Sequence, residues 1–462
     1  MVNFSIINLS KTTETSRLDA EYYQTLYVNF EKKFNNPLSI ADYVREGYRV
    51  VYETTEVFNT SDIDRTTRFL QSSDIKTPMI NLDTIGYVSN LDWERYKKGR
   101  IHRGEILIEV KGNAEKVSLV PDDFPEKTLV TGTLYKIDVS PERSKEYLLA
   151  YLISKYGVAF RNRVKTNLMV AYINKSDLYN IPVPTPSNTL VEKIESLVTT
   201  SIKKYSESKI KYQDAENILL SELGLKGYVS RTGNISIRDF AECLRDDRLD
   251  AEYWQPEYEA MEKAVSKVAQ RELGEIVSVS KGVEIGSEAY ETEGKPFIRV
   301  SDFSIYGMED AEKKMSPELY EQLKDKYTPK KGEVLFTKDG TIGLSYALQE
   351  DTAGILSGAF LRLKPTIKIN TTYLALVLNS TYCKSQIERM SGGAIIAHLK
   401  PESAKKIKIP LLSEAKQEEI AEKVSTAFRM RKEAQELLSK AKHAVEIFIE
   451  KNEAEALNCL AT

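Results

Sequence analysis

The chain has 462 residues, of which 41% are hydrophobic and 29% are charged, and its formal net charge is −3. These proportions are those of an ordinary water-soluble protein, and the small net charge argues against wholesale electrostatic attachment to nucleic acid while leaving room for a local basic groove. No apolar run approaches the roughly 18 residues of a membrane span, and the N-terminus lacks the features of a signal peptide. Three scattered cysteines, Cys243, Cys383 and Cys459, give neither a disulfide framework nor a metal site. We therefore expect a cytoplasmic protein.

An octapeptide is present twice in the chain. Arg-Leu-Asp-Ala-Glu-Tyr-Tyr-Gln at 17–24 returns as Arg-Leu-Asp-Ala-Glu-Tyr-Trp-Gln at 248–255. The correspondence continues at a nearly constant offset as far as Ile-Pro-Val-Pro at 181–184 and Ile-Lys-Ile-Pro at 407–410, while the residues between the matched blocks differ. A repeat this long indicates two complete domains, because the repeats of solenoids have periods of roughly 20–50 residues.

Each copy predicts the same elements in the same order: a charged helix, short strands broken by glycine, an amphipathic helix and an extended segment with proline. In the first copy these are helix 18–34, strands 104–110, 116–120 and 129–139, helix 145–156 and segment 181–186. In the second copy they are helix 249–268, strands 275–279, 297–300, 332–337 and 344–348, helix 372–390 and segment 407–412. We expect an α+β fold with two similar mixed α/β domains, over residues 1–188 and 227–412, each with a curved and mostly non-parallel sheet.

A long helix without internal proline is predicted after each copy, in residues 189–226 and 413–462. Residues on one face recur in steps of three and four, which is the heptad seam of a coiled coil. The seam residues are Ile194, Val198, Ser201, Tyr205, Ser208, Tyr212, Ala215 and Leu219, and Ile420, Val424, Ala427, Arg431, Ala434, Leu438, Ala441, Val445 and Phe448. Ser413 with Gln417 predicts the capped start of the second helix. We expect an antiparallel coiled coil of about 50 Å that acts as a rigid spacer; the alternative is that each helix packs on its own domain.

The sequence offers little catalytic chemistry. It has no phosphate-binding loop, no His-Glu-x-x-His and no Asn/Asp-Pro-Pro-aromatic tetrapeptide of amino-methyltransferases. One candidate is Asp92 with Glu109 and Lys111, the loose pattern of metal-dependent nucleases, in which carboxylates bind Mg²⁺ and the lysine positions water. This pattern is common by chance, and the second copy has Thr-Lys-Asp at 337–339 instead. We predict a non-catalytic chain without a cofactor or metal, in which Asp-Gly-Thr-Ile-Gly at 339–343 forms a turn.

Basic residues gather where loops are expected. Arginine and lysine bind phosphates, asparagine, serine, threonine and arginine also read base edges, and glycine lets a loop approach a duplex closely. The candidate DNA-binding residues of the first copy are Arg95, Lys97, Lys98, Arg100, Arg103, Arg161, Arg163, Lys165, Asn167 and Tyr172. Those of the second copy are Lys281, Lys338, Thr341, Arg389, Ser391 and His398. The alternative for each residue is an ordinary solvated charge, but their recurrence at 161–172 and 389–398 favours a shared role.

The residues repeated in the octapeptide form a separate group. Arg17, Asp19 and Glu21 are identical to Arg248, Asp250 and Glu252, and identical residues are poorly suited to reading two different sequences. They fit either an ion pair at the start of a helix or a docking surface that is used twice. The sequence leaves both alternatives open.

Together these features resemble the specificity subunit of type I restriction–modification systems, over nearly the whole chain. The resemblance rests on two divergent domains that each end in a proline segment before a long helix. It also rests on Gly-Glu-Val-Leu-Phe-Thr-Lys-Asp-Gly-Thr-Ile-Gly at 332–343 and on Ser-Glu-Ala-Lys-Gln-Glu-Glu-Ile at 413–420. The first copy departs from these two signatures, with Gly-Glu-Ile-Leu-Ile-Glu-Val-Lys-Gly-Asn at 104–113 and Ser-Asn-Thr-Leu-Val-Glu at 187–192.

The resemblance implies two target-recognition domains that each read one half of a split DNA site, with the helices as a spacer. It also implies partner methyltransferase subunits, two in number, that carry the methyl donor, and a restriction subunit in the full complex. On this basis we expect a DNA-reading subunit that directs adenine methylation and restriction by its partners. Two alternatives remain, a nuclease that uses Asp92, Glu109 and Lys111, and a protein-interaction scaffold with no role on DNA.

Overall fold

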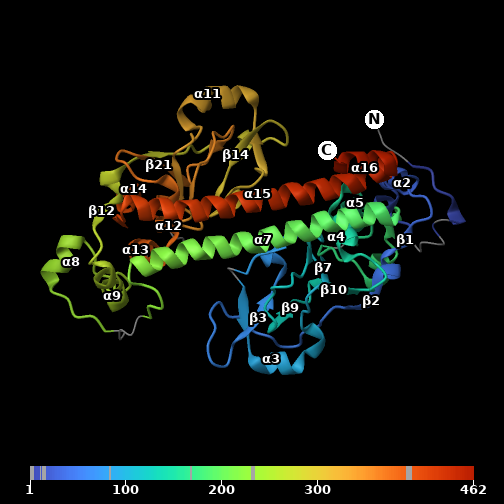
Figure 1. The fold of residues 1–462 in the computed structure, drawn as a ribbon, viewed down its shortest axis with the longest axis horizontal. Coiled ribbons are helices and arrows are strands. Elements are labelled where there is room, and N and C mark those ends of the chain that lie inside the picture. Colours follow the sequence, from blue (N-terminus) through green and yellow to red (C-terminus); the bar gives the residue numbers. More distant parts are fainter. Residues whose placement is uncertain are drawn as a thin grey trace. The chain divides into compact units, whose positions relative to one another are not determined.

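The computed structural model describes residues 5–10, 12, 17–82, 85–166, 169–229, 235–391 and 398–461 (Figure 1). Backbone contacts divide the chain into two compact units. Unit 1 comprises Met1–Ser206 and Met430–Thr462, and unit 2 comprises Glu207–Arg429. The division falls inside both long helices, so each unit holds one stretch of each helix. Target-recognition domains and helical spacers with boundaries at 188, 226 and 412 stay a prediction.

Unit 1 is built on two sheets. The larger is antiparallel, in the order β2 (Val44–Tyr48), β10 (Leu134–Val139), β7 (Ile106–Glu109) and β8 (Val117–Leu119). The smaller has the order β6 (Gly86–Val88), β3 (Thr67–Leu70) and β9 (Thr128–Val130), and its β3–β9 pair is parallel. Two short ribbons pair β1 (Leu38–Ser39) with β11 (Pro182–Val183) and β4 (Ile75–Lys76) with β5 (Met79–Ile80).

Unit 2 repeats this topology strand for strand. Its antiparallel sheet has the order β13 (Val277–Lys281), β21 (Phe360–Pro365), β18 (Val334–Thr337) and β19 (Ser345–Ala347). The second sheet has the order β17 (Lys313–Met315), β14 (Lys295–Ile298) and β20 (Ile355–Leu356), again with its last pair parallel. The ribbons are β12 (Gln270–Glu272) with β22 (Lys408–Pro410) and β15 (Phe303–Ser304) with β16 (Gly307–Met308). The shared topology agrees with the predicted pair of similar mixed α/β domains.

Shorter helices surround these sheets. Those of unit 1 are η1 (Ala20–Tyr23), α2 (Thr25–Glu31), η2 (Ile40–Tyr43), η3 (Ser72–Asp74), α3 (Asn90–Arg95), η4 (Lys97–Gly99), α4 (Lys145–Ile153), α5 (Lys155–Arg163), α6 (Lys175–Tyr179) and α16 (Glu453–Ala461). Those of unit 2 are α8 (Phe240–Asp246), α9 (Pro256–Val265), α10 (Leu273–Ile276), η5 (Ser287–Ala289), η6 (Val300–Asp302), α11 (Pro317–Tyr327), α12 (Thr371–Asn379), α13 (Thr381–Ser391) and α14 (Pro401–Lys405).

The predicted helix 18–34 is two helices, η1 and α2, which are separated by the extended backbone of Gln24. Three other predicted elements are also divided in the structure. The predicted helices 145–156 and 372–390 each break at a serine, Ser154 or Ser380, whose backbone is extended with ψ of 161° and 157°. Each serine hydroxyl donates to the carbonyl three residues earlier at 2.6 Å and accepts from an amide of the next helix. The predicted strand 129–139 is two strands, β9 and β10, which belong to different sheets. Apolar residues resume soon after both helix breaks and therefore hide them, whereas the break between β9 and β10 falls at Thr-Gly-Thr, 131–133.

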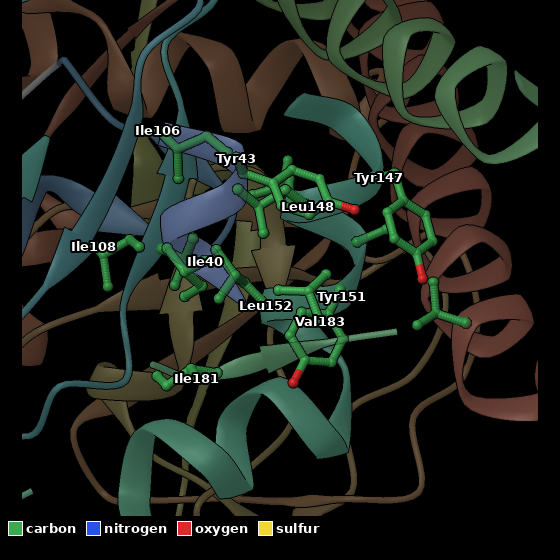
Figure 2. Packing of buried hydrophobic residues seen from close by; sticks show 14 of the residues in the cluster. Ile40, Tyr43, Ile106, Ile108, Tyr147, Leu148, Tyr151, Leu152, Ile181 and Val183 are labelled. Atoms are coloured by element: carbon green, nitrogen blue, oxygen red, sulfur yellow. The ribbon is translucent and has the colours of Figure 1, made fainter. Parts of the chain in front are cut away.

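The core of unit 1 lies between α4 and the larger sheet (Figure 2). Figure 2 shows Leu148 and Leu152 of α4 among Ile106 and Ile108 of β7 and Ile40 of η2, and all five side chains are buried. Close packing of this kind fixes the angle between helix and sheet.

Near the start of α4 and of α12, a tyrosine hydroxyl binds the proline segment at the end of the same copy. The Tyr147 hydroxyl donates to the Pro184 carbonyl at 2.8 Å, and the Tyr373 hydroxyl donates to the Pro410 carbonyl at 2.8 Å in unit 2. Burial raises the pKa of both tyrosines, so their hydroxyls stay protonated donors.

The long helices, α7 (Asn188–Glu222) and α15 (Glu414–Glu450), pack together along the predicted seam. In unit 1 the Ser201 hydroxyl donates to the Ala434 carbonyl at 2.7 Å, and Arg431 donates to the Tyr205 hydroxyl at 3.0 Å. In unit 2 the Tyr212 ring stacks on Phe428, and Lys416 lies 3.3 Å from Glu222. Residue numbers rise along one helix as they fall along the other, so both stretches are antiparallel.

The alternative arrangement is also present, because the same helices complete the core of each unit. Ile194 and Val198 join the core of unit 1, and Ile420 and Val424 join that of unit 2. At the start of α15 the Ser413 hydroxyl accepts from the Lys416 amide at 3.4 Å, which agrees with the predicted capped start. Gln417 donates to the Leu412 carbonyl at 2.9 Å and accepts from the Asn370 amide at 3.1 Å, so it ties the helix to the adjacent domain. Among the described residues, no helix is both long and apolar enough to cross a lipid bilayer.

Candidate nucleic-acid interface

A buried ion pair lies at the same place in both units. Gly104 and Gly332 have left-handed backbones, with φ of 81° and 83°, and each turns the chain into a buried glutamate at the start of a central strand. In unit 1 the carboxylate of Glu105 binds the Lys136 ammonium at 2.7 Å, and in unit 2 that of Glu333 binds both arms of the Arg362 guanidinium at 2.8 Å. Each glutamate also accepts a backbone amide three residues before it.

The buried cation also holds the segment that precedes this turn. Lys136 donates to the Arg100 carbonyl at 2.8 Å, and Arg362 donates to the Lys326 carbonyl at 2.7 Å. Both segments are rich in basic residues. The unit 1 basic segment contains Arg95, Lys97, Lys98, Arg100 and Arg103, and the unit 2 basic segment contains Lys324, Lys326, Lys330 and Lys331.

Sequence reasoning found the first basic segment and missed the second. The available signal was the alignment of Gly104-Glu105 with Gly332-Glu333, because each basic segment lies directly before one of these pairs. Lys326, Lys330 and Lys331 are exposed, as are Lys97, Lys98 and Arg103. Each unit therefore presents at least three exposed cations next to a buried anchor.

The unit 1 basic segment lines a groove of about 460 Å³. Its walls include Arg45, Tyr48, Lys97, Lys98, His102 and Arg103. Lys98 lies 5.1 Å from the centre of the Tyr48 ring, and Arg103 lies 3.7 Å from Glu126. Arg95 pairs with Glu53, and the Arg100 guanidinium lies 4.2 Å from the Trp93 ring and donates to the Trp93 carbonyl at 2.9 Å. Lys97, Lys98 and Arg103 are thus the cations best placed to meet a phosphate.

Two of the arginines predicted to bind DNA in unit 1 are buried and donate to carbonyls of the protein itself. Arg161 is 1% exposed and donates to the carbonyls of Ala114, Glu115 and Leu152 at 3.1–3.3 Å. Burial lowers its pKa to about 10. Arg163 is 5% exposed and donates to the Tyr22 carbonyl at 3.0 Å. Both guanidinium groups are buried and donate to acceptors within the protein, so we leave them out of the proposed DNA surface.

The other predicted residues of unit 1 lie in a loop beside them. Lys165 is half-buried, and burial lowers its pKa, while Tyr172 is 37% exposed and its backbone bridges to Lys111. Asn167 lies outside the described residues. Met169 and Val170, between Asn167 and Tyr172, are exposed.

The predicted residues of unit 2 form a similar loop pair. The backbone of His398 bridges to Asp339, as that of Tyr172 does to Lys111, and the His398 ring binds the Asp339 carboxylate. Lys338 is 7% exposed and also binds Asp339. Thr341 is exposed in the turn 339–343, where Gly340 and Gly343 have left-handed backbones (φ of 68° and 86°), in agreement with the predicted turn.

Three further predicted residues of unit 2 differ in their surroundings. Lys281 is exposed at the end of β13. Arg389 donates to the Tyr253 carbonyl at 3.1 Å and lies 3.6 Å from Glu262. Like Arg163, it therefore binds groups within its own unit. The Ser391 hydroxyl donates to the Ile387 carbonyl at 2.8 Å. Residues 392–397, which follow it, lie outside the described residues.

The repeated octapeptide forms an internal clip in each unit. Arg17 donates both arms of its guanidinium to Asp19 at 2.6 and 2.7 Å, and Arg248 pairs with Asp250 in the same way. The Tyr23 hydroxyl donates to the Arg17 carbonyl at 3.1 Å. At the one position where the octapeptides differ, the Trp254 indole donates to the Arg248 carbonyl at 2.9 Å.

Two guanidinium groups lie near the same tyrosine ring of each clip. Arg17 and Arg163 lie 4.9 and 4.2 Å from the centre of the Tyr22 ring. The equivalent Arg248 and Arg389 lie 4.5 and 4.3 Å from that of Tyr253. These cation–π contacts fasten the octapeptide to α5 or α13. The repeated arginine and aspartate therefore match the ion-pair alternative.

The clips make the stability of the protein depend on pH. Hydrogen bonds from Arg17 and Arg248 hold the pKa values of Asp19 and Asp250 below their ordinary range. A carboxyl whose folded pKa is depressed stabilises the fold above its unfolded pKa of about 3.9, and this stabilisation is lost as pH falls through the folded pKa. We expect the double variant D19N/D250N to melt at a lower temperature than wild type near pH 7 and to lose less of its melting temperature between about pH 6 and pH 3. An unchanged acid response would contradict this; D122N, at an exposed aspartate, is the control.

The nuclease candidate is not assembled as a metal site. The carboxylate of Glu109 accepts the amides of Glu115 and Lys116 at 3.0 and 3.4 Å. Asp92 lies in the first turn of α3, where burial raises its pKa. Within the described ranges, no group of three or more His, Cys, Asp or Glu side chains is placed to hold a metal ion.

Comparisons with known proteins extend these observations. Residues 266–439 match the family model of the type I restriction modification DNA specificity domain, which confirms over these residues the resemblance predicted from the sequence. No curated protein sequence matches the chain. Among solved structures, the chain is similar to the S subunit of a type I restriction-modification system from M. genitalium, with 15% identity over 92% of this chain and 96% of that one and a TM-score of 0.34. It is also similar to the HsdS subunit from Thermoanaerobacter tengcongensis, with 14% identity over 92% and 95% of the two chains and a TM-score of 0.28.

Proposed function

Because residues 266–439 match the DNA specificity domain, we propose that the chain is a non-catalytic DNA-recognition subunit that reads a split target and directs methylation and restriction by partner subunits. The family match is the observation that carries the proposal. The identical strand order of the two units supports giving unit 1 the same role. Each unit then reads one half of the target.

The basic segments are proposed to hold the DNA backbone. Lys97, Lys98 and Arg103 in unit 1, and Lys326, Lys330 and Lys331 in unit 2, are exposed cations on segments that a buried ion pair fixes in place. Phosphate contacts position a protein on DNA without reading its sequence. Equivalent segments in the two units therefore suit a function that both half-sites require.

The reading of bases is assigned to the loops in which the two units differ. In unit 2 these loops carry Thr341 and His398, and Lys281 lies at the end of β13. In unit 1 the equivalent loops carry Lys111, Lys165 and Tyr172. Different side chains at equivalent positions give two different half-sites, and hence an asymmetric target.

The long helices are proposed to act as the spacer between the half-sites. A helix rises about 1.5 Å per residue, so the length of α7 and α15 sets a fixed number of base pairs that neither unit reads. The partners are two methyltransferase subunits, one for each repeated unit, together with a restriction subunit. The complex acts in the cytoplasm.

Selection from a random duplex library by the chain with its methyltransferase partner tests the proposal. We expect enrichment of one bipartite motif, with an affinity that falls steeply as salt is raised. Partner binding without any motif would instead favour a protein-interaction scaffold. The purified chain alone, incubated with Mg²⁺, should leave DNA uncut; cleavage that is lost in K111A would favour the nuclease alternative.

A further inference from the structure

The first two residues of each octapeptide and the residues before them form a segment that we call the arm. The unit 1 arm lies within residues 5–18, of which the structure describes 5–10, 12, 17 and 18, and it aligns without a gap to the unit 2 arm, residues 236–249. Each arm is fastened to its own unit. The Ser5 hydroxyl donates to the Tyr23 carbonyl in unit 1, and in unit 2 Arg238 pairs with Glu259 and lies 5.1 Å from the Trp254 ring. The unit 2 arm includes α8, which is labelled in Figure 1.

Both arms expose large apolar side chains at the same aligned positions. Ile6 is 88% exposed and its counterpart Ile237 is 92% exposed. Leu18 is 85% exposed and its counterpart Leu249 is 72% exposed. At a third aligned position an apolar residue is again exposed in both arms, as Leu9 and as Phe240.

Packing within each unit does not explain why these positions are apolar in both copies. The residues between them have diverged, with Asn8 aligned to Asp239 and Lys11 to Glu242. A core position stays apolar because it is buried, but these side chains are exposed to water. Burying each of them against another molecule would contribute about 1.5–3 kcal/mol. Matched exposed apolar residues mark a surface that another molecule covers.

The repeat indicates what kind of molecule covers the arms. The DNA-reading loops differ between the units, whereas the arms retain the same apolar pattern, so each arm is suited to the same occupant. The unit 2 arm has four acidic and three basic residues and the unit 1 arm has one acidic and two basic residues, so neither arm has the concentrated positive charge that binding phosphates requires. We propose that the two arms are equivalent docking surfaces for two copies of one partner protein. The inference rests on the proposed function, under which that partner is the methyltransferase subunit.

Matched glutamine variants test the two arms separately. The unit 1 variant is I6Q/L18Q, the unit 2 variant is I237Q/L249Q, and a fourfold variant combines them. Native mass spectrometry and light scattering count the methyltransferase copies bound to the full chain. We expect two copies on wild type, one on each arm variant and none on the fourfold variant, at a concentration near the wild-type saturation point. Losing two buried aliphatic side chains weakens each site about 100-fold.

One control variant accompanies the arm variants, and three results would contradict the inference. I63Q/L91Q changes two side chains that are 89% and 79% exposed outside the arms and should leave two copies bound. Arm variants that still bind two copies would overturn the docking surfaces while leaving the proposed function intact. Wild type that binds no methyltransferase would overturn both. Self-association of the chain alone that the arm variants abolish would assign the surfaces to a second copy of this chain and also overturn the inference.

Discussion

Replacing Arg362 by methionine is expected to lower the free energy of unfolding of unit 2 by about 3–5 kcal/mol. Arg362 and Glu333 are 9% and 7% exposed, and the guanidinium binds both carboxylate oxygens at 2.8 Å. Without its partner, the Glu333 carboxylate remains buried with only a backbone amide to satisfy it, and an uncompensated buried charge is costly. The same change releases the Lys326 carbonyl, so the unit 2 basic segment loses its anchor.

Denaturant and thermal unfolding of the full chain measure this cost. K364M is the matched control, because Lys364 is on the same strand as Arg362 but is exposed. The double variant E333Q/R362M removes both charges and should recover part of the lost stability, since the buried carboxylate is gone. K136M should have a comparable effect in unit 1 through Glu105. An R362M variant no less stable than K364M would show that the buried pair does not stabilise the fold.

Removing the exposed cations of one basic segment is expected to weaken binding of the target duplex about 100-fold at physiological salt. The variants are K97A/K98A/R103A in unit 1 and K326A/K330A/K331A in unit 2. Each lysine or arginine that neutralises a phosphate contributes about 0.9 to the slope of log affinity against log salt, so each triple variant should reduce that slope by about 3. The preferred motif should not change, because phosphate contacts carry no sequence information.

Binding isotherms of the chain with its methyltransferase partner, at several salt concentrations, measure both quantities. K32A/K267A/K432A removes the same charge from exposed lysines elsewhere and is the control. If a basic-segment variant and the control have the same salt slope, that segment does not contact DNA. A change of motif without a change of slope would instead place the segment among the base-reading loops.

The elements that the sequence predicts best are those fixed by local pattern. The heptad seams of α7 and α15 are almost entirely buried, as with Ile194 and Ala434, because a coiled-coil seam repeats every 3.5 residues whatever the tertiary context. The repeat is predicted for the same reason, since both copies carry matching blocks in the same order. The helix breaks at Ser154 and Ser380 were missed because the apolar pattern continues across them.

The candidate site depends on contacts that a linear sequence does not contain. Arg161 looks like a surface cation, but carbonyls of Ala114 and Glu115, distant in the chain, receive its guanidinium in the interior. Ile6 and Ile237 show the reverse, because apolar residues are expected inside and these two lie in water. The unit 2 basic segment was missed because an acidic and an aromatic residue stand among its lysines. The alignment of Gly104-Glu105 with Gly332-Glu333 indicates the equivalence with unit 1, and the buried pair beside each segment shows it in the structure.

The central claim is that this chain chooses the DNA sequence on which its partners act. Methylome sequencing of cells with and without the gene for the chain tests it most directly. The account predicts a bipartite motif that is adenine-methylated in the presence of the chain and unmethylated in its absence. A methylome in which no motif depends on the chain would contradict it.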